Sequence, residues 1–194
     1  MTFADFEDEG STDSIHALGD ALRQVQSRVA ATSAPQAIAR QAAALLQEAS
    51  TLLEPYRYIA DRDRSWDDIK RARGSRTLNP VMTDVAWVDD HLHGRVTFSA
   101  FYLGGNGAVH GGALPSFYDE VLGRVANHGR PICRTASLKV DYRSVTLIDR
   151  DLRVEAHLER VEGRKRYAYA AMFDGEVLTC EAHGLFIELR DGAA

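Results

Sequence analysis

The residues of this sequence that are best suited to catalysis lie together in one short stretch. Residues 105–112 form a glycine-rich loop, and Asp119 follows about two turns into a predicted helix. Glycines let backbone N–H groups come close to a ligand, and a helix start adds unpaired N–H groups with a partial positive charge. A carboxylate beside such an anion-stabilising site can act on a water molecule. These two features are the minimum equipment for hydrolysis by acyl transfer.

The helix that must position this acid is predicted over residues 113–127. Its apolar stripe consists of Leu114, Phe117, Tyr118, Val121, Leu122 and Val125. Pro115 falls in the first turn, where its missing N–H costs little, and Gly129 and Pro131 mark the end. Asp119 and Glu120 flank the stripe on opposite sides, so helical periodicity alone does not choose between them.

Apolar residues alternate with a period of two on both sides of this helix, which predicts strands. Two strands precede the helix, over residues 82–89 and 94–102, and four follow it, over residues 132–143, 151–161, 165–173 and 177–189. In the first of the four, Ala136, Leu138, Val140 and Tyr142 share one face, and Thr135 belongs to the other. Hairpin turns are predicted at residues 162–164 and 174–175. The order predicts an α+β fold, in which a curved antiparallel sheet of about six strands wraps around one long helix.

The N-terminal part of the chain predicts a separate helical extension. We expect residues 1–80 to form this extension and a connector, and residues 81–194 to form the sheet-and-helix domain. Two apolar stripes at helical spacing indicate a helical hairpin, with Ser33 and Gln36 as a capping box for its second helix. A further short helix is predicted from Ser65 to about Gly74. The connector also holds Arg71, Arg73 and Arg76, which are candidates for contacting a phosphate.

Composition excludes several classes of protein. The chain has 194 residues, 45% of them hydrophobic, and a net charge of −5, which argues against general nucleic-acid binding. No apolar run approaches the roughly 20 residues that cross a bilayer, and the acidic start lacks the pattern of a secretory signal. Cys133 and Cys180 both fall in predicted strands, which favours two reduced, buried thiols over a disulfide. We therefore expect a cytoplasmic protein without nucleic-acid or membrane partners.

Other site chemistries have weaker support. His91 and His93 have a spacing that metals use, but no cysteine or further acid–histidine cluster accompanies them, so no metal site is predicted. The sequence has no G-x-S-x-G motif and no locally supported Cys/His pair, so a serine or cysteine nucleophile is not expected. His110 remains an alternative base, although we favour a role in ordering the loop.

Residues 80–189 resemble the PaaI-like acyl-CoA thioesterases of the hotdog-fold superfamily, and most closely their Them-type branch. The likeness rests on the run Val109-His110-Gly111-Gly112 with Asp119 nine positions after the histidine, and continues through residues 135–143, 161–165 and 185–189. It implies the hotdog fold, a role in fatty acid metabolism, and no cofactor beyond the coenzyme A of the substrate. Active sites of this family form between subunits, so the resemblance implies a homodimer or a dimer of dimers, that is, a homotetramer.

The resemblance also implies roles for individual residues. Asp119 matches the catalytic general base or nucleophile, and Gly112 matches the N–H donor that polarises the thioester carbonyl. Thr135 matches a hydroxyl that positions water, often across a subunit interface, and His110 shapes the loop. Apart from the resemblance, Asn106, Gly111 and Glu120 are candidates for the surroundings of the substrate, with a structural or supporting role favoured for Glu120. Arg143, Arg164, Lys165 and Arg166 are candidates for the phosphates of coenzyme A, because a guanidinium binds phosphate through its planar fork. Solvated charges in and near a hairpin turn are the equally weighted alternative for these residues.

Two departures from the family pattern concern the substrate. Some relatives carry an asparagine six positions before the histidine, whereas this chain has Gly104 there and Asn106 two residues later. Pro115 and Tyr118 are large for their positions and are expected to narrow the acyl tunnel.

Hydrolysis of acyl-CoA to a free acid and coenzyme A is the function that the sequence favours. Two alternatives remain. The helical extension motivates a non-catalytic acyl-CoA or acyl-carrier binding module, and the fold also serves enoyl-CoA hydratases and dehydratases.

Overall fold

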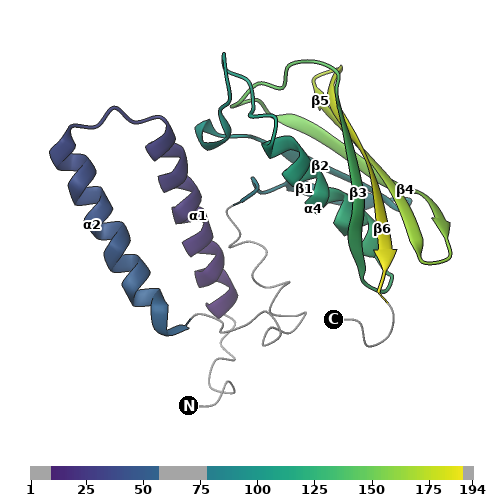
Figure 1. Ribbon diagram of the computed structural model, residues 1–194, viewed down its shortest axis with the longest axis horizontal. Helices are drawn as coiled ribbons and strands as arrows, with labels where there is room; N and C mark the ends of the chain where they lie inside the picture. The colour runs from purple at the N-terminus through teal and green to yellow at the C-terminus, as the bar shows by residue number, and fades with distance from the viewer. Residues whose placement is uncertain (1–9, 57–77, 190–194) are drawn as a thin grey trace. The chain divides into compact units, whose positions relative to one another are not determined.

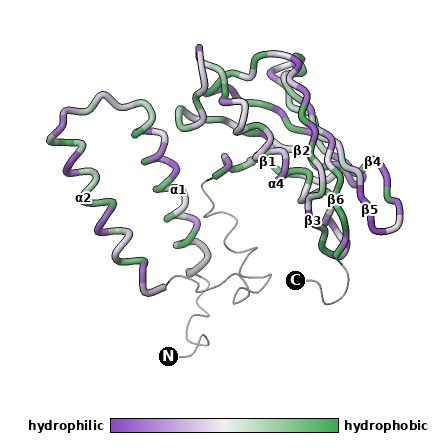
Figure 2. Tube along the Cα trace, viewed as in Figure 1, coloured by the Kyte–Doolittle hydropathy of each residue, from purple (hydrophilic) through white to green (hydrophobic). Residues whose placement is uncertain are grey.

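The computed structural model describes residues 10–56 and 78–189 of two compact units, Met1–Thr77 and Leu78–Ala194. The first unit contains helices α1 (Gly10–Ala30) and α2 (Gln36–Leu53), followed by the short 3-10 helix η2 (Glu54–Tyr56). Hydrophobic and hydrophilic segments alternate along both long helices (Figure 2), as the spacing predicted. Most of their large apolar side chains are exposed: α2 buries no residue, and its Leu52 is 73% exposed.

The start of α2 differs from the prediction. Pro35 is the N-cap residue, and no side chain caps the helix, so the capping box from Ser33 to Gln36 does not form. Instead, the Ala34 N–H donates to Thr32 Oγ1, and the Ala39 N–H donates to the Pro35 carbonyl. Proline suits this place because it lacks the N–H that a helix start leaves unpaired. The predicted helix near residues 65–74 and the three connector arginines lie outside the described residues.

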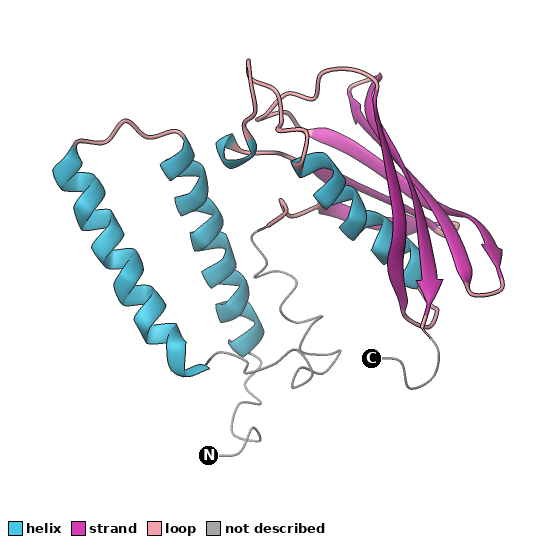
Figure 3. Ribbon diagram, in the orientation of Figure 1, coloured by secondary structure: helices cyan, strands magenta, loops and turns pink. Residues whose placement is uncertain are grey.

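The second unit is a single antiparallel sheet with one long helix, α4 (Ala113–Asn127), against it. The strands are β1 (Thr83–Val88), β2 (His91–Val96), β3 (Cys133–Tyr142), β4 (Leu152–Glu162), β5 (Lys165–Asp174) and β6 (Val177–Glu188). They run in the order β1-β2-β4-β5-β6-β3. The sheet curves around α4 (Figures 1 and 3), as predicted, and the helix contacts β3, β4, β5 and β6.

Helix α4 has the bounds that its pattern predicted, and its whole apolar stripe is buried. Tyr118 is fully buried and donates its hydroxyl hydrogen to the Cys180 carbonyl at 2.6 Å. The helix comes so close to β6 that a Cβ on Gly184 would lie 3.1 Å from Leu122 and 2.6 Å from Phe186. Asn127 ends the helix by accepting a hydrogen bond from the Cys133 N–H at 2.7 Å. The core of the unit therefore lies between α4 and the concave face of the sheet.

The second predicted strand is displaced. It was expected over residues 94–102, whereas β2 covers His91–Val96 and residues Ala100–Tyr102 form the 3-10 helix η5. The hairpin between β1 and β2 turns at Asp89 and Asp90, which have φ of 48° and 62°. Residues 89–90 are Asp-Asp and not the Asn-Gly pair that usually marks such a turn, which explains why the position of the turn was missed.

A β-bulge in β3 changes the face of Thr135. The register with β6 pairs Thr135 with Phe186 and Ser137 with Leu185, so Ala136 is an extra residue. Directly paired residues share a face of the sheet, and Phe186 is buried in the core. Thr135 therefore lies on the helix side with Leu138 and Val140, and the strict alternation predicted for this strand was wrong at this point.

Candidate active site

The glycine-rich loop is a small hairpin held at its base. The Gly104 N–H donates to the Ala108 carbonyl at 2.8 Å, and the Ala108 N–H donates to the Gly105 carbonyl at 3.0 Å. Asn106 and Gly107 form the turn between them, with φ of 52° and 77°. Asn-Gly is the pair favoured for this turn type, so the position of Asn106 is explained by backbone conformation. Its exposed side chain stays a substrate-binding candidate.

His110 controls one of the two glycine N–H groups that follow it. Its Nδ1 atom accepts a hydrogen bond from the Gly112 N–H at 3.0 Å, so in this arrangement Nδ1 carries no proton. The Gly111 N–H has no hydrogen-bond acceptor among the described residues. The loop thus presents the Gly111 N–H as an open donor. A ligand oxygen can accept from the Gly112 N–H only by replacing His110 Nδ1. The His110 side chain thus binds the backbone of its own loop.

Tyr142 is a site residue that the sequence reasoning did not single out. It is the last residue of β3, and its hydroxyl donates to the Gly111 carbonyl at 2.6 Å. The pKa of Tyr142 is raised above its ordinary value by partial burial, so the hydroxyl keeps the proton that it donates. The signal was present in the alternation of β3, which placed Tyr142 on the helix face at the strand end next to the loop.

Asp119 and Thr135 meet within one chain. The Thr135 hydroxyl donates to Asp119 Oδ1 at 2.8 Å, and both residues are exposed. The resemblance implied that this threonine often acts across a subunit interface, whereas here α4 and β3 of the same chain bring the two together. Among the described residues, no side chain or backbone group donates a hydrogen bond to the other carboxylate oxygen, Oδ2.

The acid and the loop of one chain are well separated along α4. Gly112 and Asp119 are seven residues apart, which corresponds to about 10 Å at the helical rise per residue. Reacting atoms must approach to about 3–3.5 Å. One chain therefore offers two half-sites: the Asp119–Thr135 pair, and the loop with its N–H groups.

A groove of about 380 Å³ lies beside the loop. It is lined by Ala108, Val109, Gly111, Leu114, Tyr142, Arg143, Ser144, Val145 and Thr146. Most of these contacts are apolar or backbone, and Arg143 supplies a positive charge. A site of this composition suits a ligand with an apolar part and an anionic part.

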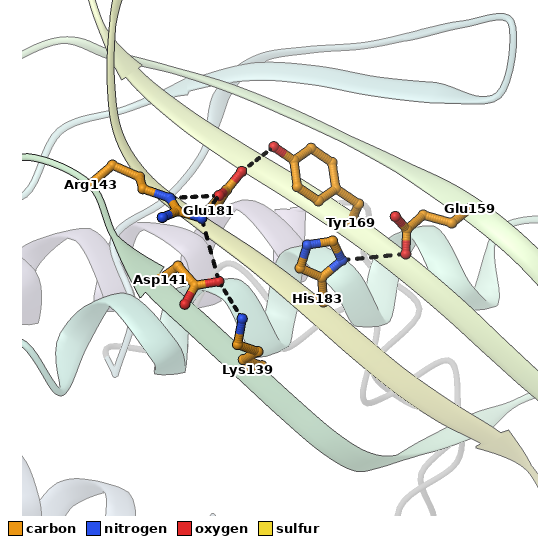
Figure 4. A network of polar contacts seen from close by, with 7 residues as sticks. All are labelled: Lys139, Asp141, Arg143, Glu159, Tyr169, Glu181 and His183. Atoms are coloured by element: carbon orange, nitrogen blue, oxygen red, sulfur yellow. Dashed lines mark hydrogen bonds and ion pairs between the residues drawn. The ribbon is translucent and has the colours of Figure 1, made fainter.

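The charge of Arg143 is shared with a polar network on the outer face of the sheet (Figure 4). Its guanidinium lies 2.6 Å from Glu181 Oε1 and 3.8 Å from Asp141. Tyr169 donates to the other oxygen of Glu181 at 2.6 Å. These hydrogen bonds from Tyr169 and Arg143 lower the pKa of Glu181. Of the four candidates for the coenzyme A phosphates, Arg143 is the one that lines the groove.

The other three candidates lie at the opposite end of α4. Arg164 and Lys165 belong to the exposed β4–β5 hairpin, and Arg164 donates to the Glu188 carbonyl at 3.0 Å. Arg166 is only 2% exposed and donates to the carbonyls of Ala126 and Pro131 while pairing with Glu188. Arg166 therefore ends α4 and cannot reach a phosphate, contrary to the prediction.

Two remaining assignments concern Glu120 and metals. Glu120 pairs with Arg124 one turn along α4 at 3.4 Å, so it stabilises the helix surface.

Among the described residues, no group of three or more histidine, cysteine or acidic side chains is arranged to hold a metal ion. None of the helices that the structure describes has the length and apolar character of a membrane span.

Comparison with known proteins agrees with this architecture. The family model of the thioesterase superfamily matches residues 106–181, which run from the loop through α4 to β6. A solved thioesterase superfamily protein is 23% identical to this chain with a TM-score of 0.74, over 89% of this chain and 94% of that chain. The match therefore extends beyond the second unit.

Two further solved structures match about half of the chain. The PaaI protein from the phenylacetic acid degradation operon of E. coli is 16% identical, with a TM-score of 0.51 over 55% of this chain and 79% of that chain. A Streptococcus mutans protein solved with acetyl CoA is 13% identical, with a TM-score of 0.52 over 55% and 87%. At these identities the likeness shows the fold, and it confirms the fold predicted from the sequence.

Proposed function

We propose that this chain, whose second unit has the hotdog fold and whose residues 106–181 match the thioesterase superfamily model, hydrolyses acyl-CoA thioesters to a free acid and coenzyme A. The observation that carries the proposal is the Asp119 carboxylate, which is exposed on α4 and held by the Thr135 hydroxyl. Asp119 is the general base: it takes a proton from a water molecule that attacks the thioester carbon. The oxyanion formed is stabilised by the N–H groups of Gly111 and Gly112.

Thioester chemistry suits this set of groups. When the tetrahedral intermediate collapses, the C–S bond breaks and coenzyme A leaves as a thiolate, whose conjugate thiol has a pKa near 8.5. Such a leaving group needs no strong general acid. Water activation and oxyanion stabilisation remain, and the half-sites described above supply one each.

A complete site requires two chains. Because Asp119 lies about 10 Å from the loop of its own chain, it can serve only a thioester held by the loop of another copy. We therefore propose a homodimer, alone or as a dimer of dimers, in which each site combines Asp119 and Thr135 of one chain with the loop of its partner. A two-fold axis makes both sites equivalent.

The groove beside the loop is the proposed place of the substrate. Arg143 at its edge is the proposed contact for a phosphate of coenzyme A, and the acetyl CoA bound by the S. mutans protein shows that a protein of this fold takes such a ligand. Cys133 and Cys180 are free and buried, and burial raises the pKa of the Cys180 thiol to about 11. Reduced thiols of this kind fit the cytoplasm as the place of action.

Release of free thiol from short, medium, long and aryl acyl-CoA esters tests the proposal, with Asp119→Asn beside the wild type. Loss of the base should lower kcat by about 10³-fold, while the melting temperature stays near that of the wild type. A wild type that binds coenzyme A but releases no thiol would replace hydrolysis by a binding role. Hydration of an enoyl-CoA with the thioester intact would indicate a hydratase.

A mixed dimer tests the sharing of sites. Gly112→Pro removes the N–H at a residue whose φ of −76° proline accepts, and each single variant should be nearly inactive. Co-expression of Asp119→Asn with Gly112→Pro should restore about a quarter of the wild-type activity, because half of randomly formed dimers hold one intact site. No restoration in a purified mixed dimer would contradict the shared site.

A further inference from the structure

The peptide group between Gly111 and Gly112 is held from both sides. On its carbonyl side, the Tyr142 hydroxyl donates to the Gly111 oxygen at 2.6 Å, and on its N–H side the Gly112 nitrogen donates to His110 Nδ1 at 3.0 Å. A peptide group is planar and trans, so its carbonyl and its N–H point in opposite directions. Fixing one end therefore fixes the direction of the other.

The Gly111–Gly112 peptide depends on these hydrogen bonds for its orientation more than the neighbouring peptides do. Both flanking residues are glycines, whose backbone rotates with little steric resistance, so the peptide plane between them can turn over at low cost. The preceding peptide is held differently: the His110 carbonyl accepts from the Ala113 N–H at 2.9 Å, a bond within the backbone at the helix start. The orientation of the Gly111–Gly112 peptide depends instead on two side chains.

A reversed peptide would be harmful in the proposed reaction. The Gly111 carbonyl, with its partial negative charge, would then point to the side on which the oxyanion forms, and repulsion would replace a hydrogen bond. On substrate binding the thioester oxygen must replace His110 Nδ1 as the acceptor for Gly112. Once His110 Nδ1 has been replaced, the hydrogen bond from the Tyr142 hydroxyl is the one side-chain contact among the described residues that still fixes this peptide.

We propose that Tyr142 is a positioning residue, which keeps the Gly111–Gly112 peptide turned so that its N–H faces the thioester oxygen throughout the reaction. This inference rests on the proposed thioesterase function. The phenol acts through the peptide and exchanges no proton with the substrate. It lies at the end of β3, where a strand paired along its length with β6 gives it a rigid base.

Tyr142→Phe removes the hydroxyl and keeps the ring that lines the groove. We expect kcat for the best acyl-CoA ester to fall by about 10- to 100-fold, since part of the oxyanion stabilisation is lost. KM should change little, because the groove surface is unchanged. A trifluoromethyl ketone analogue of that ester, which forms a tetrahedral adduct, should lose affinity by a similar factor. A non-reacting thioether analogue should keep its affinity.

Tyr167→Phe is the matched control. Tyr167 also donates its hydroxyl to an oxygen, Glu162 Oε2 at 3.2 Å, but it lies at the far β4–β5 hairpin. This variant should retain wild-type kcat and inhibitor affinities, and both variants should melt near the wild-type temperature.

The outcomes separate this inference from the function on which it rests. If the wild type hydrolyses no thioester, both fail. If the wild type is active and Tyr142→Phe matches it in kcat and in affinity for the ketone, the positioning role alone is overturned. Equal loss of affinity for ketone and thioether would likewise overturn it, because Tyr142 would then act in ground-state binding.

Discussion

At the scale of single residues, the candidate site depends on hydroxyl groups that hold other groups in place. Thr135 and Asp119 are sixteen residues apart in the sequence, and a 2.8 Å hydrogen bond joins them. This bond occupies one carboxylate oxygen and restricts rotation of the side chain. The other oxygen can then face a water molecule in a constant direction, which is what a general base requires.

Removal of the Thr135 hydroxyl should therefore impair catalysis without affecting the fold. Thr135→Val keeps the shape of the side chain on an exposed strand position, so we expect kcat to fall by about tenfold, the equivalent of about 1.4 kcal/mol. Thr135→Ser keeps a hydroxyl and should retain most of the activity. Thiol-release assays on both purified variants provide the measurement. Equal activity of the valine and serine variants would remove the role assigned to this hydroxyl.

At the scale of elements, short irregularities in the strands set the positions of these residues. The bulge at Ala136 turns Thr135 toward α4, and the turn at Asp89 and Asp90 sets the register between β1 and β2. Both aspartates have positive φ, a backbone region that asparagine and glycine occupy at lower cost. The β1–β2 turn is thus a place where the natural sequence does not have the most stable residues.

Replacement of Asp89 by Asn and Asp90 by Gly should stabilise the protein. The expected gain in the free energy of unfolding is about 0.5–1 kcal/mol, because Asn-Gly is the preferred pair for a turn with two positive φ values. Thermal unfolding should show a rise in Tm of about 1–4 °C. Gly175→Ala makes the opposite change in the β5–β6 turn, at φ of 58°, and should destabilise by about 1 kcal/mol. An unchanged or lower Tm for the Asn-Gly variant would contradict the turn assignment.

The hydrogen bonds to Glu181 on the outer face of the sheet should make the stability of the protein depend on pH. Tyr169 and Arg143 lower the pKa of Glu181 below its ordinary value of 4.5. Around and below pH 4.5 the unfolded chain binds more protons at this group than the folded protein does, so stability rises with pH in that range. The contribution is fully present above about pH 4.5 and is lost as the pH falls through the folded-state pKa.

Glu181→Gln should reveal this contribution. The variant should be less stable than the wild type at pH 7, and the difference should shrink as the pH is lowered from about 4.5 toward 3. Urea unfolding of both proteins at pH 7 and at about pH 3 measures the difference in the free energy of unfolding. A difference that stays constant with pH would show that ionisation of Glu181 has no part in the stability.

At the scale of the whole molecule, the chain is built of two units with different surfaces. Every residue of the buried hydrophobic cluster lies between Met82 and Phe186, within the second unit. The long helices of the first unit keep large apolar side chains exposed, for example Leu45 at 60% and Leu52 at 73%. The core on which the stability of the second unit depends therefore lies within that unit.

A fragment of residues 78–194 should fold without the first unit. We expect far-UV circular dichroism of a β-rich protein and cooperative thermal unfolding, since no member of the core is removed. The full-length protein, measured in parallel, is the control. A fragment that lacks a cooperative transition would show that residues 1–77 contribute to the core.

The sequence by itself determined the features that repeat within a short window. The apolar stripe of residues 113–127 defined α4, and alternation defined five of the six strands closely. The spacing of His110 and Asp119 pointed to the candidate site only through the family resemblance. Local periodicity carries this information because each helix or strand buries one face. The tertiary structure alone decided that Thr135 faces Asp119, that Arg166 ends α4, and that Tyr142 holds the Gly111 carbonyl. Each of these contacts joins residues from separate elements of the fold. Whether such a contact forms depends on a one-residue bulge or on the reach of a long side chain, and both act only when the partner strand or helix is in place.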